Sequence, residues 1–544
     1  MTFQSAKADE NGDLKERIDH CESSKGTMQD DLHQAQRAAE EERGATFLQS
    51  IKQHRAAVAW SVLLSTAIIM EGYDMKLIGS LNAQPAFTRR YGHLLPNGDY
   101  QITAAWQAGL SNGASVGSLI GLYLNGHISE HLGFKKAMLL SLIFMTAAIF
   151  IPFFAPSVEV LLVGQIFQGI PWGVFQTLTT AYAAEVCPVH LRGYLTTYVN
   201  LCWVIGQFLS AGVLRAMATR TDEWAYRIPF AIQWIWPVPL IIAISFAPES
   251  PWWCVRKGRI VDAKTNLRRL VDSRTTPAES LDNMVKLMEV TVSQEREAGT
   301  GKHYPDCFRG VNRRRTMIAC CTWGIQILSG TGLRTYATYF YHQAGLPATQ
   351  AFNMSLIQYA LGIVGVWISW LMLPHFGRRT MYIWGLAGLE ICLLVMGGLG
   401  TRPTTSVMGW AIGSMLILYT LVYDITVGPI CYALVSEVPA SELRSKTVVL
   451  ARMTYNTLNI VSNVITPYML NPGAWAWGAK TGFFFAGTCF LSLVFTLHCI
   501  PETKDRTYAE LNVLFQRRTK AWKFTDETVI LNAEDQVRES NPPL

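Results

Sequence analysis

Charged side chains are scarce in this chain: of its 544 residues, 16% are Asp, Glu, Lys or Arg. A soluble protein usually carries about a quarter of charged residues, because its surface faces water on all sides. Half of the residues are hydrophobic, and the 42 Gly and 17 Trp are typical of membrane proteins, where Gly is common in helices and Trp collects at interfaces. The composition argues against a soluble domain. The net charge of +6 is small and spread out, so no nucleic-acid partner is expected.

The sequence also lacks the patterns of metal sites and of common enzyme centres. Its 11 Cys are scattered, with no Cys-x-x-Cys pair and no Cys/His cluster at zinc spacing, so we expect neither a disulfide framework nor a metal site, and no cofactor. It has no phosphate-binding Gly loop and no Ser/His/acid set, and His127, His131 and His375 all lie at the ends of apolar runs. The chain is therefore not expected to be an enzyme.

Long apolar runs, by contrast, fill most of the chain. Runs of about 20 apolar residues have the length of a helix that crosses a bilayer. They cover residues 57–79, 104–126, 136–155, 158–180, 195–216, 229–247, 316–341, 351–374, 380–400, 407–433, 447–470 and 481–500. One long polar stretch, 248–315, divides them six and six. The sequence predicts an all-α polytopic membrane protein with twelve transmembrane helices in two six-helix halves, 57–247 and 316–500.

Lys and Arg in the connections give an orientation, because cytoplasmic loops carry an excess of them. The connections after the second, eighth and tenth runs and the central stretch carry many, including Lys135, Lys136, Arg378, Arg379, Arg444 and Lys446. Arg215, Arg220 and Arg227, between the fifth and sixth runs, are exceptions. Residues 1–56 are polar and contain no secretory signal. We therefore expect the tails 1–56 and 501–544, and the loop 248–315 with short helices, to be cytoplasmic. The expected location is the plasma membrane, and the expected oligomeric state is a monomer in the lipid bilayer.

Three short motifs occur once in each half, at offsets of 244 to 253 residues. They are Gly133-Phe134-Lys135-Lys136 and Gly377-Arg378-Arg379; Glu185-x-x-Pro188 with Leu191-Arg192-Gly193, and Glu437-x-Pro439 with Leu443-Arg444-Ser445; and Pro248-Glu249-Ser250-Pro251 and Pro501-Glu502-Thr503-Lys504. All lie at the expected cytoplasmic ends of helices. We expect a gate there, in which ion pairs join the halves and break as the halves rock apart. Its members would be Glu185, Arg192, Arg378, Arg379, Glu437 and Arg444. A simpler interpretation is that these charges only set the topology.

These motifs resemble the signature set of the sugar-porter branch of the major facilitator superfamily, over roughly Val58 to Phe515. Three further segments resemble the fungal maltose and α-glucoside permeases more narrowly. They are Glu71-Gly72-Tyr73-Asp74, Pro171-Trp172-Gly173, and Tyr336-x-x-Tyr339-Phe340-Tyr341-x-Gln343-Ala344-Gly345. The resemblance implies the major-facilitator fold, a site at the midplane between the halves, and import of an α-glucoside such as maltose by proton symport with alternating access. The chain departs from the family pattern at Ser118, His131, Phe134 and Gln165, which puts coupling and substrate preference in doubt.

A sugar presents hydroxyls and apolar ring faces, so its site needs amides and aromatic planes. Asn200 and Gln207 lie seven residues apart and share one helical face. The resemblance adds sugar-contacting positions in the second half, occupied here by Gln326, Tyr432, Tyr455 and Asn456. Small residues near them, Gly330 and Gly332, could leave room for a second ring. The alternative for each polar residue is a hydrogen bond between helices.

Glu71 and Asp74 are the expected carriers of proton coupling. Both lie in an apolar run, three residues apart on one helical face. Two ionised carboxylates there would be unfavourable, so we expect at least one to hold a proton. The resemblance implies Asp74 as the coupled acid, with an Arg of the fourth run as its partner. Gln165 stands at that position, and we expect Arg452 to replace it. The alternative is that both acids only cap polar groups between helices.

Arg334 lies deep in the seventh run. We expect it in the outer third of the membrane, where it snorkels to the interface, pairs with Glu390 or Asp424, or binds a substrate carboxylate. Together with Ser118 and Gln165 it leaves open a sugar-porter-type exporter or importer of another small metabolite. A non-transporting sugar sensor also stays open, although only a short tail follows Phe515. The 248–315 loop could in addition bind a cytoplasmic partner.

Overall fold

The structure is a computed structural model that describes residues 51–94, 100–187, 189–271, 277–298, 304–402, 406–440, 443–504, 506, 508–524 and 527. The predicted N-terminal tail lies almost wholly outside this part, as does the end of the C-terminal tail. The chain divides into a larger unit, made of Trp60–Ala183, Gly193–Ala247 and Thr300–Leu544, and a smaller unit, made of Met1–Ala59, Ala184–Arg192 and Pro248–Gly299.

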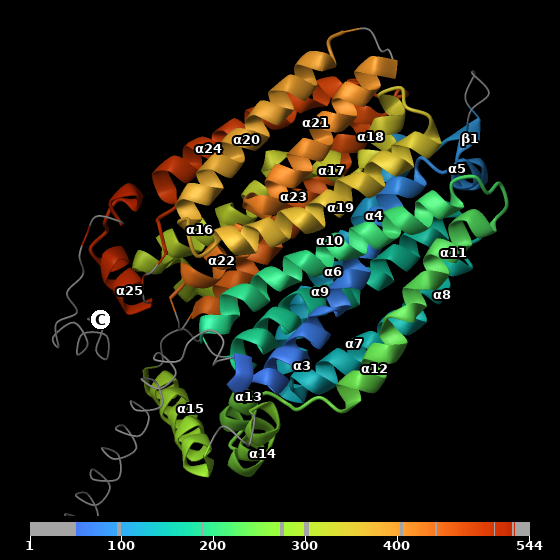
Figure 1. Cartoon of the computed structure of the whole chain (residues 1–544). Coiled ribbons are helices and arrows are strands. Elements are labelled where there is room, and N and C mark those ends of the chain that lie inside the picture. The colour runs from blue at the N-terminus through green and yellow to red at the C-terminus, as the bar shows by residue number, and fades with distance from the viewer. Residues whose placement is uncertain are drawn as a thin grey trace, which may run out of the picture. The chain divides into compact units, whose positions relative to one another are not determined.

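The N-terminal half of the larger unit consists of helices and one short antiparallel hairpin (Figure 1). In chain order the elements are α3 (Arg55–Ser65, which begins in the smaller unit), α4 (Ala67–Leu81), α5 (Pro85–Tyr91), β1 (His93–Leu94), β2 (Tyr100–Gln101), α6 (Ala104–Leu132), α7 (Phe134–Ala148), α8 (Phe150–Phe153), α9 (Val158–Val186), α10 (Val189–Met217), α11 (Trp224–Ile232), η1 (Gln233–Ile235) and α12 (Pro237–Ser245). The hairpin pairs His93 with Gln101 and Leu94 with Tyr100.

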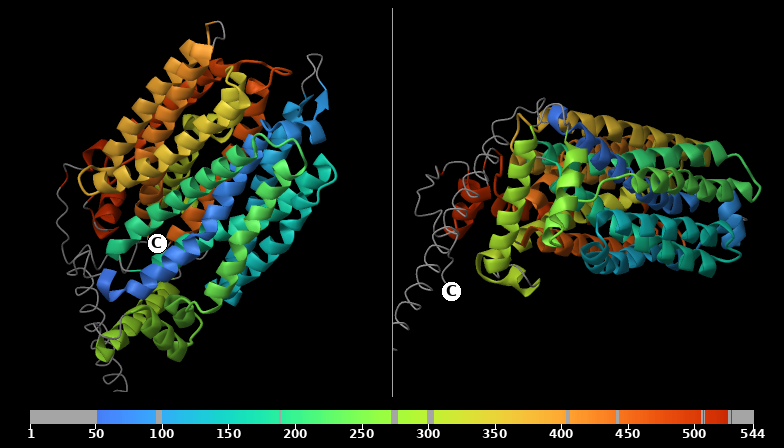
Figure 2. Two further views of the ribbon diagram at one scale, coloured as in Figure 1. Left: turned by 45° about the vertical axis from the view of Figure 1, so that its right-hand side comes forward. Right: turned by 90° about the horizontal axis from the view of Figure 1, so that it is seen from below.

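Helices are the regular secondary structure of the C-terminal half among its described residues, and Figure 2 shows its long helices running side by side. The elements are η2 (Tyr304–Phe308), α16 (Gly310–Gln326), the π-helical turn η3 (Ile327–Thr331), α17 (Gly332–Thr335), α18 (Ala337–Gln343), α19 (Ala348–Met372), α20 (Arg378–Leu399), α21 (Ser406–Ile425), α22 (Val427–Glu437), α23 (Arg444–Leu470), η5 (Gly478–Lys480), α24 (Thr481–Cys499), α25 (Tyr508–Gln516) and η6 (Ala521–Lys523). In the smaller unit, α13 (Pro251–Arg256), α14 (Ile260–Leu270) and α15 (Ala278–Ala298) pack against one another.

Each of the twelve predicted runs corresponds to one helix or to successive helices, which confirms the predicted fold class. The first run is α3 with α4, the third α7 with α8, the sixth α11 to α12, the seventh α16 to α18, and the tenth α21 with α22. The other runs are single helices. The seventh run is interrupted at Gly330, whose φ of 106° lies in the left-handed region that favours glycine. This break turns the backbone next to Gln326, a predicted substrate contact.

Among the described residues, nine helices are long and apolar enough to cross a membrane. The helices of the second, seventh and eleventh runs are not among them, although they are the right length. Two of these, α6 and α23, pack along each other and carry polar side chains into their contact. Asn459 donates a hydrogen bond to Ser115 at 3.2 Å, and Asn112 donates to the carbonyl of Ile460 at 3.2 Å. Their low hydropathy therefore reflects the polar side chains that α6 and α23 direct toward each other between the halves.

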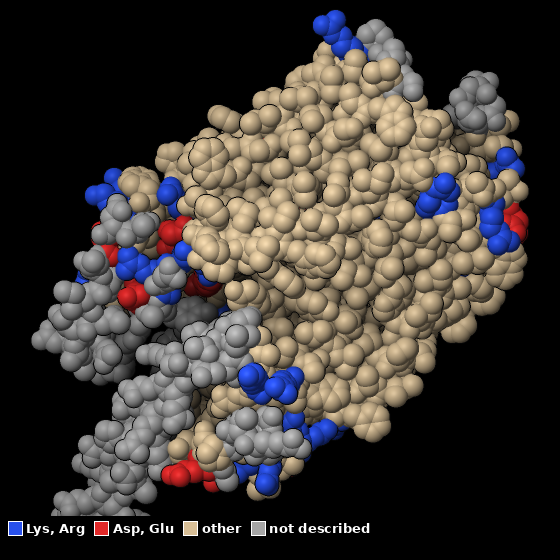
Figure 3. Space-filling view, in the orientation of Figure 1, with Lys and Arg blue, Asp and Glu red and all other residues tan. Residues whose placement is uncertain are grey.

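Glycines allow α6 and α9 to approach closely. A Cβ at Gly117 or Gly173 would overlap the backbone of the opposite helix. Small residues of this kind drive helix association in membranes, where lipid tails are as apolar as Leu. Apolar side chains cover the outward faces of the bundle, among them Leu371, Trp384, Ile391 and Leu491, each more than 60% exposed. Figure 3 shows the corresponding broad surface of the larger unit almost free of charge, as a lipid-facing surface requires.

Candidate functional site

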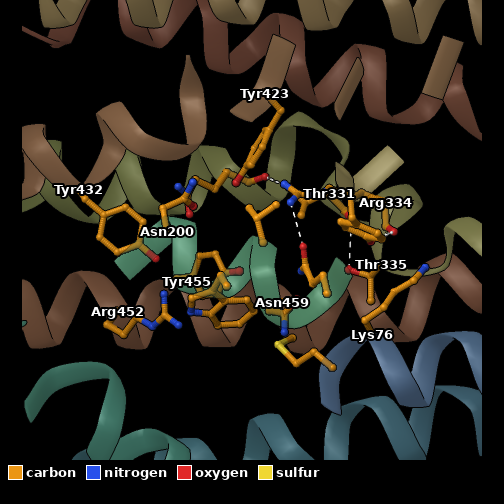
Figure 4. A pocket seen from close by; sticks show the side chains of 16 residues that line it. Lys76, Asn200, Thr331, Arg334, Thr335, Tyr423, Tyr432, Arg452, Tyr455 and Asn459 are labelled. Atoms are coloured by element: carbon orange, nitrogen blue, oxygen red, sulfur yellow. Dashed lines mark hydrogen bonds between the residues drawn. The ribbon is translucent and has the colours of Figure 1, made fainter. Parts of the chain in front are cut away.

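A cavity of about 620 Å³ lies between the two halves of the larger unit (Figure 4). Its lining consists of Met75 and Lys76 of α4; Asn200, Trp203, Val204 and Gln207 of α10; Gln326, Thr331, Arg334 and Thr335 of the broken seventh run; Tyr359 of α19; Tyr423 of α21; Tyr432 of α22; and Arg452, Tyr455 and Asn459 of α23. A second cavity of about 260 Å³ adjoins it and shares five lining residues, Met75, Trp203, Arg452, Tyr455 and Asn459. The remainder of the second lining is Glu71, Ala114, Ser115, Ser118, Trp172, Gln176 and Asn456.

All six residues predicted to contact substrate line one of these two cavities. Asn200, Gln207, Gln326, Tyr432 and Tyr455 line the larger cavity, and Tyr455 and Asn456 line the smaller one. The structure thus brings together residues from α10, α16, α22 and α23, which are far apart in the sequence.

The predicted amides differ in their hydrogen bonds. Gln326 donates to the carbonyl of Gly428 at 3.1 Å, and Gln207 accepts from Arg334 at 2.9 Å, so both link helices. The Nδ2 atoms of Asn200 and Asn456 are buried and have no hydrogen-bond partner among the described residues. A buried donor without an acceptor is costly. These two amides are therefore free to donate to a ligand.

Aromatic rings surround Arg452 in the wall between the two cavities. Its guanidinium carbon lies 4.5 Å from the ring centroids of Trp323 and Tyr455, and 5.8 Å from that of Trp203. Trp323 also packs edge-on against Tyr432, with centroids 5.5 Å apart. The sequence reasoning missed Trp203. Its position three residues after Asn200 and four before Gln207 places it on the same helical face, and this spacing could have found it.

Glu71 and Arg452 lie on opposite sides of the boundary between the halves. Glu71 is 1% exposed, and its Oε1 lies 3.9 Å from a terminal nitrogen of Arg452. Gln176 of α9 joins them: its Nε2 donates to Glu71 Oε1, and its Oε1 accepts from Arg452 Nε at 2.6 Å. This cluster of Glu71, Gln176 and Arg452, here called the buried joint, connects α4 and α9 with α23.

The expected pairing of Asp74 with Arg452 is wrong. Asp74 is fully buried and accepts a hydrogen bond at 2.5 Å from Gln233. Gln233 in turn accepts from Gln168 at 2.8 Å, and Gln168 accepts from Gln165 at 3.1 Å. Glu71 and Asp74 are three residues apart on α4, so their side chains point in directions that differ by about 60° around the helix axis. Because of this rotation, Glu71 faces Arg452 while Asp74 faces an amide chain inside its own half.

Arg334 does not snorkel to an interface. It is 4% exposed, its Nη1 lies 3.2 Å from Asp424 Oδ1, and its Nη2 donates to Gln207 at 2.9 Å. Its guanidinium also lies over the ring of Tyr423, 5.0 Å from the centroid. Of the expected partners, Asp424 is the one it contacts. Snorkelling was wrong because the break at Gly330 and α17 direct the side chain into the cavity.

The repeated motifs form matching networks in the two halves. In the larger unit, Thr503 donates to Glu437 at 2.5 Å, and Arg378 lies 3.5 Å from the same carboxylate. Glu502 accepts from the backbone nitrogens of Arg378 and Arg379, at 2.7 and 3.1 Å, and so caps α20. In the smaller unit, Ser250 donates to Glu185, which pairs with Arg256 at 2.5 Å.

These networks lie within one half or within the smaller unit. In this conformation they fix helix ends, and an ion-pair gate that joins the halves stays a prediction. The side chain of Arg192 lies outside the described residues, and that of Arg444 is partly buried at the start of α23. Phe134 stands where the second half has Arg378, and Arg256 supplies the cation for Glu185 instead.

The halves also meet at the end of the helices near β1 and β2. Thr338 of α18 lies 3.2 Å from Lys76 Nζ and 3.1 Å from Ser80 Oγ, both of α4. Gln101 donates to Tyr339 at 2.9 Å, and Tyr336 donates to Ser111 at 2.6 Å. These bonds join the halves beside Lys76, which also lines the larger cavity.

The chain is similar to known carriers over most of its length. Residues 60–515 match the family model described as sugar (and other) transporter. The chain is 41% identical over 499 residues to the general alpha-glucoside permease of Saccharomyces cerevisiae, a match that covers 91% of this chain and 81% of that protein. It is 41% identical over 516 residues to the maltose permease MAL31 of the same species, covering 94% and 84%.

Among solved structures, the chain is similar to the major facilitator superfamily proton:xylose symporter XylE bound to 6-bromo-6-deoxy-D-glucose. The TM-score is 0.70 at 20% identity, with 85% of this chain and 99% of that chain covered. A partially occluded, inward-open form of XylE from E. coli gives a TM-score of 0.68 at 18% identity, covering 83% and 100%. At this identity the likeness shows the fold, which is that of the major facilitators.

Proposed function

The chain belongs to the sugar (and other) transporter family, and from this premise we propose that it imports an α-glucoside such as maltose by proton symport with alternating access. Like its permease relatives, it is a multi-pass membrane protein that acts as a carrier and not as an enzyme. The proposed partners are the sugar, protons and the lipid bilayer. The proposed location is the plasma membrane, with both termini and the 248–315 loop in the cytoplasm.

The observation that carries this proposal is the shared lining of the two cavities by the six predicted contacts, which come from both halves. The free donors of Asn200 and Asn456 suit sugar hydroxyls, and Trp203 and Tyr455 offer planes for the apolar ring faces. A ligand between the halves would contact both, as alternating access requires.

The buried joint supports a role in proton coupling for Glu71 and Asp74, the two acids of the first run. Glu71 contacts Arg452 across the boundary between the halves, so its charge bears directly on how firmly the halves hold together. Protonation of Glu71 removes that attraction and leaves the hydrogen bond from Arg452 to Gln176 as the remaining link within the buried joint. Asp74 has its contacts within the N-terminal half, and we assign it the role of a second proton holder beside Glu71. A carrier loaded with sugar and proton then turns more readily, because one attraction between opposite charges across the boundary is gone.

Uptake of radiolabelled sugars by cells that lack their own permeases tests the function. The proposal predicts that the chain accumulates maltose, that a protonophore abolishes accumulation, and that other α-linked disaccharides compete with maltose. Strong glucose uptake that excess maltose does not inhibit would contradict it. Cells that carry the empty vector serve as the control for residual uptake.

A further inference from the structure

Lys76 is a buried cation in the wall of the larger cavity that the proposed mechanism does not use. It is 1% exposed, and its Nζ donates a hydrogen bond to Thr338 Oγ1 at 3.2 Å. The ammonium also lies 5.0 Å from the centroid of the Tyr359 ring. An ammonium has three N–H groups, and in the part of the chain that is described Thr338 is its one hydrogen-bond acceptor. Two donors are therefore left for a ligand.

Charges around the larger cavity do not balance. The cations in its lining are Lys76, Arg334 and Arg452. Asp424 pairs with Arg334 at 3.2 Å and Glu71 pairs with Arg452 at 3.9 Å, but no described carboxylate oxygen lies within 4.0 Å of Lys76. Of the three cations in the lining, two therefore have a carboxylate partner among the described residues, and Lys76 has none.

Asp74 does not supply the missing charge, although it is close in sequence. Residues two apart on a helix face opposite sides, so Asp74 points away from Lys76. Its carboxylate accepts from Gln233, in the amide chain of the N-terminal half. An isolated cation in the membrane interior is costly unless something anionic meets it. Lys76 is among the residues that line the larger cavity, so a ligand in that cavity is the remaining source of negative charge.

Arg334 extends the same positive region. Its guanidinium lies 5.5 Å from the Tyr359 centroid, so Lys76 and Arg334 share this ring as a neighbour. Arg334 Nε is buried and has no hydrogen-bond partner among the residues described. Figure 4 shows Lys76 and Arg334 at one end of the cavity and Tyr432 and Arg452 at the other. The cavity therefore has a cationic end next to a wall of amides and aromatic rings.

We propose that Lys76, with Arg334 beside it, binds a carboxylate on the substrate, so that the carrier prefers α-glucosides bearing one carboxylate group. This inference rests on the proposed function, since it assumes that the glucoside occupies the larger cavity. A surplus of one cation suits a monoanionic carboxylate better than a dianionic phosphate ester. The glucosyl ring would lie toward Asn200 and Tyr455, and the acidic unit toward Lys76.

Two matched ligands test the inference in cells that express the full chain. Maltobionate and maltitol are both α-glucosides with an open-chain second unit, and they differ by a carboxylate in place of a CH2OH group. We expect maltobionate to inhibit maltose uptake at a concentration at least about tenfold lower than maltitol, since hydrogen bonds to a charged acceptor are the stronger ones. Glucose 1-phosphate, an α-glucoside with a dianionic group, is expected to inhibit less than maltobionate.

Variants of Lys76 connect the preference to this residue. In Lys76→Met, the inhibition constant of maltitol divided by that of maltobionate is expected to fall to near one. In Lys76→Arg, which keeps the positive charge, this ratio is expected to stay high. Lys480→Met, which removes an exposed Lys of η5, controls for a loss of charge elsewhere and is expected to keep the ratio.

Equal inhibition by maltobionate and maltitol in the native chain, with maltose uptake intact, would overturn this inference and leave the proposed function standing. Stronger inhibition by glucose 1-phosphate than by maltobionate would overturn the assignment of a carboxylate. A preference for maltobionate that persists in Lys76→Met would remove Lys76 from the site. Absence of uptake of both labelled maltose and labelled maltobionate would overturn the proposed function as well.

Discussion

The buried joint makes a quantitative prediction for the substitution Glu71→Gln. Glu71 and Arg452 lie 3.9 Å apart and are 1% and 2% exposed. At an effective dielectric constant of 20, two unit charges at this distance attract each other by about 4 kcal/mol. The amide of Gln has nearly the shape of the carboxylate and removes this attraction permanently. In the variant, the equilibrium constant between joined and separated halves then shifts toward the separated state by up to about a thousandfold.

The expected phenotype separates coupling from binding. Glu71→Gln should lose accumulation of maltose against a gradient, so that the concentrations inside and outside become equal. Exchange of labelled for unlabelled maltose across the membrane should survive, because the cavity still binds sugar and the halves still rock. The assay compares the two rates in one batch of proteoliposomes. Glu159→Gln, which changes an exposed carboxylate at the start of α9, is the control that should behave like the native chain.

Asp74→Asn tests whether the second acid also takes part in coupling. Its contact with Gln233 lies within the N-terminal half, so this variant keeps the buried joint. If Asp74 also carries a coupled proton, accumulation is lost while exchange stays at the native rate.

Accumulation at the native level in Glu71→Gln, still abolished by a protonophore, would refute the reasoning, since the proton would then be carried elsewhere.

Three further predictions concern separate parts of the molecule. Asn200→Leu removes a buried free donor, and the KM for maltose should rise about tenfold, which corresponds to a loss of about 1.4 kcal/mol of binding free energy. Initial rates over a range of maltose concentrations measure the KM, and an unchanged KM would remove Asn200 from the site. Thr503→Val leaves the carboxylate of Glu437 without the hydroxyl that donates to it at 2.5 Å, and should destabilise the fold by about 1–3 kcal/mol. The thermal unfolding midpoint should fall, and an equal fall in the exposed control Thr265→Val would show that the network is not the cause. Gly173→Val inserts a side chain where α6 and α9 touch, and folded protein should no longer be recovered after detergent extraction; a native yield with native uptake would contradict the close approach.

The fold could be predicted from the sequence because a bilayer fixes the length of the helices that cross it. The breaks inside the runs could not. The turn at Gly330 depends on packing against side chains of other helices, Leu393 and Phe485 among them, which a single run does not reveal. Since that turn directs Arg334 inward, the depth of Arg334 counted along a straight helix led to the wrong expectation of snorkelling.

Residues that line the cavity were predictable where one helical face held several polar groups, as with Asn200 and Gln207. Partners across the halves were not, because they depend on rotations that sequence spacing leaves open. Arg452 faces Glu71 through such a rotation, three residues from the expected Asp74. Lys76 was overlooked because a lone Lys in an apolar run gives no sign of whether it reaches an interface or faces a cavity.

Proton movement with the sugar is the property on which the proposed function most directly depends. Addition of maltose to lightly buffered, energy-depleted cells that express the chain should make the medium more alkaline, since protons enter with the sugar. The alkalinisation should be absent in Glu71→Gln and in cells with the empty vector. Maltose entry at the native rate with no change in external pH would contradict proton symport.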